Sequence, residues 1–182
     1  MSQVLSKLLI IAALVMPSGA AFALSTDSGQ PIDIEADRAE ADNARRVTIY
    51  RGDVIITQGT LKITGEIVTI YYNEKNKLTK LVSVGKPARF SQLPDGQPDI
   101  PKNYQNARAK RMEYYAVKDL IVLLGSAVYD QSGDRVAAER IVYDSKNSRM
   151  QAESRATPKG TGSEEKKQRS RVRIKIEPKK SN

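Results

Sequence analysis

Apolar and polar residues alternate with a period of two along most of the chain, most clearly from Tyr50 to Tyr72. The β-branched run Val54–Thr57 follows a turn signal at Arg51-Gly52-Asp53, and a second break at Gln58-Gly59 precedes more alternation. Period-two alternation, β-branched residues and glycine punctuation are typical of short strands rather than helices. The pattern predicts three short strands with two breaks. The tripeptide Arg51-Gly52-Asp53 also occurs as an adhesion motif, but its place between strands favours a turn.

The same pattern recurs downstream in the sequence LLGSAVYDQSGDRVAAERIVYD, which ends at Asp144. Gly52 aligns without a gap with Gly125, and the upstream residues Ala36, Arg38 and Glu40 align with Ala109, Arg111 and Glu113. Such an internal repeat indicates architecture and outweighs local propensity. It predicts that residues 106–119, which have a helical composition, form a strand and a turn as residues 33–46 do.

Further strands are expected on both sides of this unit. Ile32 and Ile34 share one face of a first, edge strand, and Asp33 and Glu35 the other. These carboxylates could contribute to a calcium site, but without convergent oxygens from elsewhere a solvated strand face is the simpler interpretation. The remaining expected segments are a strand at 78–90 interrupted at Gly85-Lys86-Pro87, an exposed loop at 92–103, a central strand at 120–124, and strands at 136–143 and 150–152.

The N-terminus has the features of a secretory signal peptide, which predicts that residues 1–23 are removed. Lys7 precedes the short apolar run Leu8–Met16, and Ala21-Phe22-Ala23 resembles a cleavage site. A span across a bilayer needs about 20 apolar residues, so this run is too short to be an anchor. We therefore expect an exported, soluble protein that begins at Leu24.

The 182-residue chain contains no cysteine and no histidine. An exported protein without disulfides depends on packing alone. The absence of histidine removes the commonest metal ligand and the usual general base. We therefore predict no metal site, no cofactor and no catalytic residues.

Charge is unevenly distributed, because the C-terminal region is basic whereas the body at 24–154 is almost neutral. Residues 155–182 contain ten Lys or Arg and three Asp or Glu. Such a region can contact phosphates of nucleic acid or lipid, or only improve solubility. Export and the lack of aromatic–basic interleaving argue against nucleic acid. Lipid phosphate and simple protection of a sheet edge by charge both remain open.

A strand is also expected within this basic region. Residues 155–169 have the composition of a flexible linker, 170–178 form an amphipathic strand, and 179–182 are a tail. The apolar face of the strand comprises Val172, Ile174 and Ile176. Because a lone strand is unstable, it must join a sheet edge in its own molecule or in a neighbour.

Several motifs together resemble a known family. They are the export signal, the opening Gln-Pro-Ile-x-Ile-Glu at 30–35, the run Gly-Asp-Val-Ile-Ile-Thr-Gln-Gly-Thr at 52–60, Gly-Lys-Pro-Ala at 85–88 and Met112-x-Tyr114. They resemble the organic-solvent-tolerance (OstA-like) family, the periplasmic A component of the lipopolysaccharide transport (Lpt) system. The likeness covers about 30–152 and resumes at Arg171–Pro178, whereas the linker is longer than the family pattern.

This resemblance implies an all-β fold, a twisted β-jelly roll of two antiparallel sheets that is open at both ends. It implies a carrier that passes lipopolysaccharide from the inner to the outer membrane through an apolar groove. Its partners would be the acyl chains of lipopolysaccharide, the inner- and outer-membrane transport components, and further copies stacked head to tail. Val172, Ile174 and Ile176 would then form an oligomer edge.

Five residues are expected to line the lipid groove: Ile32, Ile34, Ile49, Phe90 and Tyr114. They lie on the apolar parity of strands that should enclose one space, and matching positions line the groove in the resembled family. The alternative is that they form a closed core that contacts only protein.

Two other function classes fit the sequence less well. An exported enzyme without His or Cys would need paired carboxylates or a Ser–Lys arrangement, but the acidic residues lie mostly on polar strand faces. Another jelly-roll component of the same pathway would need an uncleaved anchor or a long barrel sequence after the domain. A non-catalytic periplasmic carrier is therefore preferred, and a non-catalytic periplasmic assembly module is a further alternative.

Overall fold

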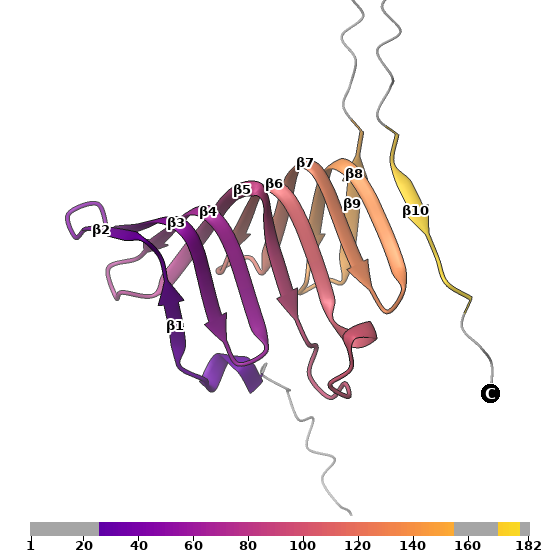
Figure 1. Cartoon of the computed structure of the whole chain (residues 1–182), viewed down its shortest axis with the longest axis horizontal. Helices are drawn as coiled ribbons and strands as arrows, with labels where there is room; N and C mark the ends of the chain where they lie inside the picture. The colour runs from indigo at the N-terminus through magenta and orange to yellow at the C-terminus, as the bar shows by residue number, and fades with distance from the viewer. Residues whose placement is uncertain (1–25, 155–170, 179–182) are drawn as a thin grey trace, which may run out of the picture.

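A computed structural model describes residues 26–154 and 171–178 of the protein, and the regular secondary structure of these residues is almost entirely β-strand (Figure 1). Two short 3-10 helices, η1 (Thr26–Gly29) and η2 (Pro101–Asn103), accompany the strands. The strands are β1 (Ile32–Glu35), β2 (Arg38–Asp42), β3 (Val47–Gln58), β4 (Leu61–Tyr72), β5 (Leu78–Gln92), β6 (Gln105–Tyr115), β7 (Leu120–Gln131), β8 (Asp134–Asp144), β9 (Arg149–Glu153) and β10 (Arg173–Lys175).

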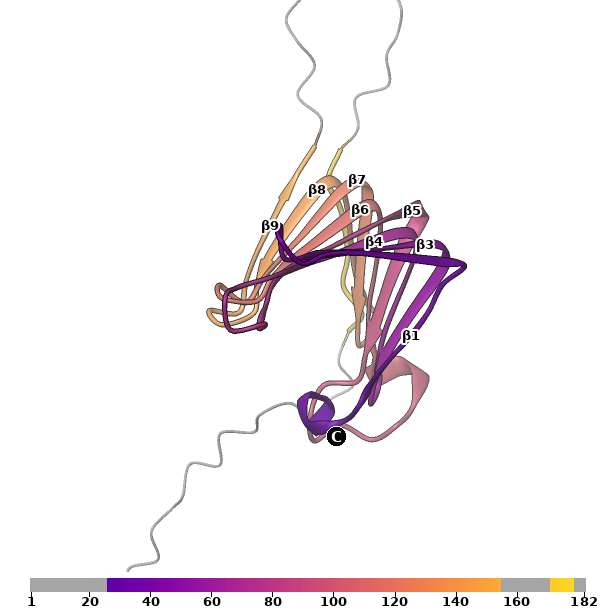
Figure 2. The same cartoon turned by 90° about the vertical axis from the view of Figure 1, so that its left-hand side faces the viewer.

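All ten strands belong to one antiparallel sheet in which β3 to β8 follow one another in sequence order. At one edge β1 and β2 both pair with β3, and at the other β9 and β10 both pair with β8. The sheet does not close, and it folds over a ridge so that two arms face each other (Figures 1 and 2). The expected all-β, antiparallel, open architecture is confirmed, with both layers formed by one folded sheet. We call the arm with β1 and β10 the front arm and the arm with β2 and β9 the rear arm.

A line of β-bulges creates this fold of the sheet. The pairing register shifts near the middle of every ladder from β3–β4 to β7–β8. Bulges bend a strand and increase its twist, so a row of them turns the sheet sharply along one line. The turn expected at Arg51-Gly52-Asp53 is wrong for this reason. Gly52 and Asp53 have φ values of +80° and +36° and form a bulge inside the continuous strand β3.

The interruption expected at Gly85-Lys86-Pro87 is likewise a bulge, since β5 runs through it from Leu78 to Gln92. Lys86-Pro87 is a cis peptide bond. In contrast, the repeat-based expectation of a strand at 106–119 is confirmed, because β6 (Gln105–Tyr115) ends in a turn.

The repeat is present in the backbone itself. Gly52 and Gly125 both have φ of +80° at equivalent bulges, and Gly59 and Ser132 have φ of +58° and +52° at equivalent turns. Strands β3 and β4 therefore correspond to β7 and β8.

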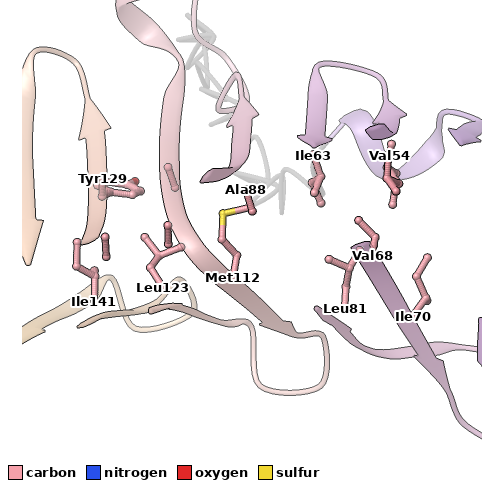
Figure 3. Close-up of a cluster of buried hydrophobic side chains, with 14 of the residues drawn as sticks. Val54, Ile63, Val68, Ile70, Leu81, Ala88, Met112, Leu123, Tyr129 and Ile141 are labelled. Carbon is pink, nitrogen blue, oxygen red and sulfur yellow. The ribbon is translucent and has the colours of Figure 1, made fainter. Parts of the chain in front are cut away.

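The hydrophobic core lies between the two arms. In Figure 3, Val54 and Ile63 of the front arm face Val68, Ile70 and Leu81 of the rear arm, and all five are buried. Burial of aliphatic side chains on both arms provides the main force that holds the folded sheet together.

Three predicted segments lie outside the described residues: the signal peptide at 1–23, the linker at 155–169 and the tail at 179–182. Within the part of the chain that the structure describes, no helix is long and apolar enough to cross a membrane.

Candidate functional site

An apolar cavity of about 540 Å³ lies between the arms on the N-terminal side of the sheet. Side chains of the front-arm strands form one wall of the cavity, and side chains of the rear-arm strands form the other. Its apolar lining is formed by Ile32, Ile34, Ile56, Leu61, Ile63, Ile70, Tyr72, Leu78, Leu81, Phe90, Met112, Tyr114, Ala116 and Ile121. A space of this size bounded mainly by hydrocarbon is suited to an apolar ligand.

Four of the five residues predicted to line a groove are brought together here: Ile32, Ile34, Phe90 and Tyr114. Ile34 and Ile56 are opposite each other in the β1–β3 ladder, and Phe90 lies opposite Ile63 in β4–β5. Ile32 is 59% exposed, so the cavity remains open at the β1 edge.

Ile49 does not line this cavity. Its neighbour Tyr50 packs on the core, and successive side chains of a strand point to opposite faces. Ile49 therefore lies on the outer face, between Glu40 and Thr69.

Few polar residues line the cavity beside its hydrocarbon surface; they are Asp27, Gln58, Gln92, Glu113 and Ser145. The hydroxyl of Tyr114 lies 3.4 Å from a carboxylate oxygen of Asp119. Burial, together with this negative charge, raises the pKa of Tyr114, so the ring stays neutral. The interior thus offers little to bind except apolar surface.

Asp27 of η1 holds the N-terminal segment against one rim of the cavity. Its carboxylate accepts hydrogen bonds from the Thr60 amide (2.7 Å), the Thr60 hydroxyl (2.8 Å) and the Gln92 side-chain amide (2.9 Å), and the residue is only 5% exposed. Burial raises the pKa of Asp27, but the hydrogen bonds from Thr60 and Gln92 outweigh burial and leave the pKa below its usual value. Gly59 is necessary beside it, because a Cβ there would lie 2.2 Å from Asp27 Oδ1.

Sequence reasoning missed much of the lining, including Ile56, Ile70, Tyr72, Leu81 and Met112. Alternation assigned each of these residues to one of the two faces of its strand, but it could not show which face points inward. Asp27 had no sequence signal, because its partners at 60 and 92 are remote in the chain.

The three residues predicted to form an oligomer edge lie at the β10 end of the sheet. Arg173–Lys175 pairs with Ala137–Arg135 of β8 in the same chain, along the part of β8 that β9 leaves unpaired. Val172 packs against the core, whereas Ile174 and Ile176 are 63% and 72% exposed.

The outer face of the rear arm contains a buried ionic cluster around Glu113. Its carboxylate accepts hydrogen bonds from Tyr115 Oη (2.5 Å) and Arg111 Nε (2.6 Å) and lies 3.0 Å from Lys80 Nζ. Burial raises the pKa of Glu113, but these donors together with the charge on Arg111 lower it to about 2. The cluster ties β5 to β6 behind the cavity wall.

No metal centre accompanies these features: the residues that the structure describes contain no group of three or more Asp or Glu side chains placed to hold an ion.

Comparisons with known proteins agree on one kind of molecule. The family model described as LptA/(LptD N-terminal domain) LPS transport protein matches residues 33–149. Lipopolysaccharide export system protein LptH of Pseudomonas aeruginosa is 36% identical over 163 residues, covering 90% of this chain and 88% of that protein. Lipopolysaccharide export system protein LptA of Escherichia coli K12 is 35% identical over 148 residues, covering 80% and 77%.

A solved structure shows the same fold. The crystal structure of P. aeruginosa LptH, described as the LptA-homologous periplasmic component of the lipopolysaccharide transport device, matches with a TM-score of 0.67 at 34% identity. The match covers 84% of this chain and 99% of that chain.

Proposed function

The chain belongs to the LptA/LptD N-terminal family of lipopolysaccharide transport proteins, and from that premise we propose that its cavity holds lipopolysaccharide acyl chains during transport. The protein is a periplasmic component of this transport system, as its relatives are. The predicted cleavage after Ala23 accords with this location. The proposed role is carriage and bridging, with no catalytic step.

The observation that supports this proposal is the apolar cavity, which is bounded by both arms and open at the exposed edge residue Ile32. Burial of one CH₂ group gains about 0.8 kcal/mol, so a chain of about 12 such groups would gain on the order of 10 kcal/mol. Binding of that strength needs a continuous apolar surface and no specific chemistry. Movement of the lipid onward would need work supplied by other components.

The two edges of the sheet suggest how copies could connect. Strands β1 and β2 at one edge and β9 and β10 at the other each pair with only one strand of the described residues. Unpaired strand edges readily accept another strand. We propose head-to-tail stacking that joins the cavities of successive copies, with Val172, Ile174 and Ile176 near the contact. Light scattering of a chain that ends at Ser154 should show shorter assemblies, and an unchanged size would remove 170–178 from the contact.

The variant Ile34→Asp tests the lipid site directly. In an open cavity the new carboxylate can reach water, so the fold should largely survive while an acyl chain can no longer pass it without desolvating a charge. We expect near-native thermal melting and at least tenfold weaker capture of photo-crosslinkable lipopolysaccharide.

Ile49→Asp is the matched control, since Ile49 is a half-buried isoleucine on the opposite face of the sheet. Its capture of lipopolysaccharide should equal that of the wild type. Near-native melting of Ile34→Asp with undiminished capture would remove this residue from the lipid path. Global unfolding of Ile34→Asp would instead identify a closed core.

The family description also covers the N-terminal domain of LptD, so another jelly-roll component of the same pathway is the second candidate. The alignment of 90% of this chain with 88% of LptH favours the component to which LptH corresponds.

A further inference from the structure

A second hollow, of about 840 Å³, lies on the outer face of the sheet along the line of bulges. It is separate from the lipid cavity, because none of its lining residues is shared with that cavity. Val84, Pro87 and Val128 provide apolar surface within it. Glu66 is the single acidic residue that lines the hollow. Four basic residues surround the apolar surface: Lys86, Arg89, Arg108 and Lys110.

Two of these cations face each other directly. Arg89 and Arg108 are opposite partners in the β5–β6 ladder, and both are exposed. They point outward, because the adjacent residues Ala88 and Ala107 are buried in the core. Like charges at directly opposed positions of a ladder destabilise the sheet.

No carboxylate within the described residues relieves this repulsion, since neither guanidinium has an ion pair. The only acid of the hollow, Glu66, lies 3.4 Å from Lys86 Nζ, and that pair is largely exposed to solvent. The arrangement therefore costs stability in the free protein, and an anionic ligand would remove the cost.

Lys110 completes the hollow through a close approach to the backbone. Its aliphatic stem lies over Gly125, where a Cβ would be 3.0 Å from Lys110 Cβ and Cδ. Gly125 is a bulge residue with φ of +80°. The bulge line thus shapes the outer hollow as well as folding the sheet.

We propose that this hollow, which we call the bulge-line site, binds phosphate groups carried on a saccharide. Guanidinium groups bind phosphate through paired charge-assisted hydrogen bonds, and two adjacent guanidiniums with two ammonium groups match a ligand with more than one phosphate. The concave shape favours a discrete head group over a flat membrane, and apolar surface between the cations suits the faces of sugar rings. The phosphorylated saccharide of lipopolysaccharide has this chemistry, and in naming this source the proposal rests on the proposed function.

The test uses the full mature chain and a phosphorylated saccharide prepared from lipopolysaccharide by complete removal of its acyl chains. Calorimetric titration should show binding that weakens with salt, because the contacts are solvent-accessible charges. The same saccharide after enzymatic dephosphorylation should bind at least tenfold more weakly. Equal binding of the two saccharides, or no binding of either, would overturn the proposal.

Arg108→Glu gives a result that a merely structural residue would not give. It replaces a repulsive cross-strand pair with an attractive one, so thermal stability should stay the same or rise while saccharide affinity falls about tenfold or more. Arg108→Gln should give a smaller loss of affinity. Lys77→Glu, which makes the same charge change at an exposed turn residue outside the hollow, is the control and should bind as the wild type does.

Two further outcomes separate this site from its alternatives. Capture of whole lipopolysaccharide through its acyl chains should persist in Arg108→Glu, whereas Ile34→Asp should lose that capture and keep the saccharide. Failure of the bulge-line site is therefore distinguishable from failure of the lipid cavity. Binding to vesicles of phosphatidylglycerol and phosphatidylethanolamine without binding to the saccharide would identify a membrane contact instead and would contradict the proposal.

Discussion

The two copies of the repeat have equivalent backbones but differ in the side chains that they direct between the arms. In the first copy Ile56 and Ile70 line the apolar cavity. The residues at the equivalent positions of the second copy are Tyr129 and Tyr143, whose rings pack with centroids 5.7 Å apart. The larger side chains at these two positions fill space between the arms in the second copy that the two isoleucines leave free in the first.

The copies differ in the same way on the outer face. Glu40 is exposed on the edge strand β2, whereas its repeat equivalent Glu113 is buried in the middle of the sheet among Lys80, Arg111 and Tyr115. The position in the sheet therefore determines whether the same residue type is solvated or structural.

Among the changes that test this comparison, exchange of side chains between the copies should have the largest effect, a loss of lipopolysaccharide capture. The double variant Ile56→Tyr/Ile70→Tyr gives the first copy the residues of the second, and its rings should occupy the cavity. Exclusion of about four CH₂ groups of an acyl chain costs about 3 kcal/mol, which corresponds to roughly a hundredfold loss of lipopolysaccharide capture. Capture should be measured beside thermal melting, and undiminished capture by a folded double variant would show that the chains bind elsewhere.

The substitution Glu113→Gln should have the next largest effect, a decrease of about 2–3 kcal/mol in the free energy of unfolding. The folded-state pKa of Glu113 is about 2, below its usual 4.5, so its contribution is complete above pH 4.5 and disappears as the pH falls toward 2. Urea denaturation from pH 7 to pH 2 should show the difference between wild type and variant shrinking over that interval. Glu40→Gln is the control and should have almost no effect, while an equal loss for both would contradict the comparison.

The smallest difference concerns the two repeat turns, each of which is contacted by an acidic residue near one end of the chain. Asp27 contacts Gly59 and Thr60, and Glu177 contacts Gly133, but Asp27 is buried whereas the side chain of Glu177 is 44% exposed. Removal of a buried, hydrogen-bonded carboxylate should lower the free energy of unfolding by about 1–3 kcal/mol, so Asp27→Ala should lower the melting temperature. Glu177→Ala should change it little, and a larger loss for Glu177→Ala would reverse our ranking.

The sequence was sufficient to predict an all-β fold, the repeat and four residues of the cavity, because alternation and glycine positions are local signals. It was wrong about the three short strands expected over 50–72, which are parts of two long strands, β3 and β4. It could not distinguish a turn from a bulge at Gly52, since both require a residue with positive φ and only the partner strand decides between them. The face of Ile49 was missed for a related reason. Val47 and Ile49 lie on the more apolar face of this part of β3, yet Tyr50, on the other face, is the residue that packs against the core.

The direct test of the proposed lipid site compares two adjacent tyrosines, Tyr72, which lines the apolar cavity, and Tyr71, which is 40% exposed on the opposite face. A photo-crosslinking phenylalanine analogue replaces each residue in turn, and the exported protein is irradiated in cells that are transporting lipopolysaccharide. We expect a lipopolysaccharide adduct from position 72 and little or none from position 71. Equal labelling at the two positions, or labelling at 71 alone, would contradict the placement of the lipid between the arms.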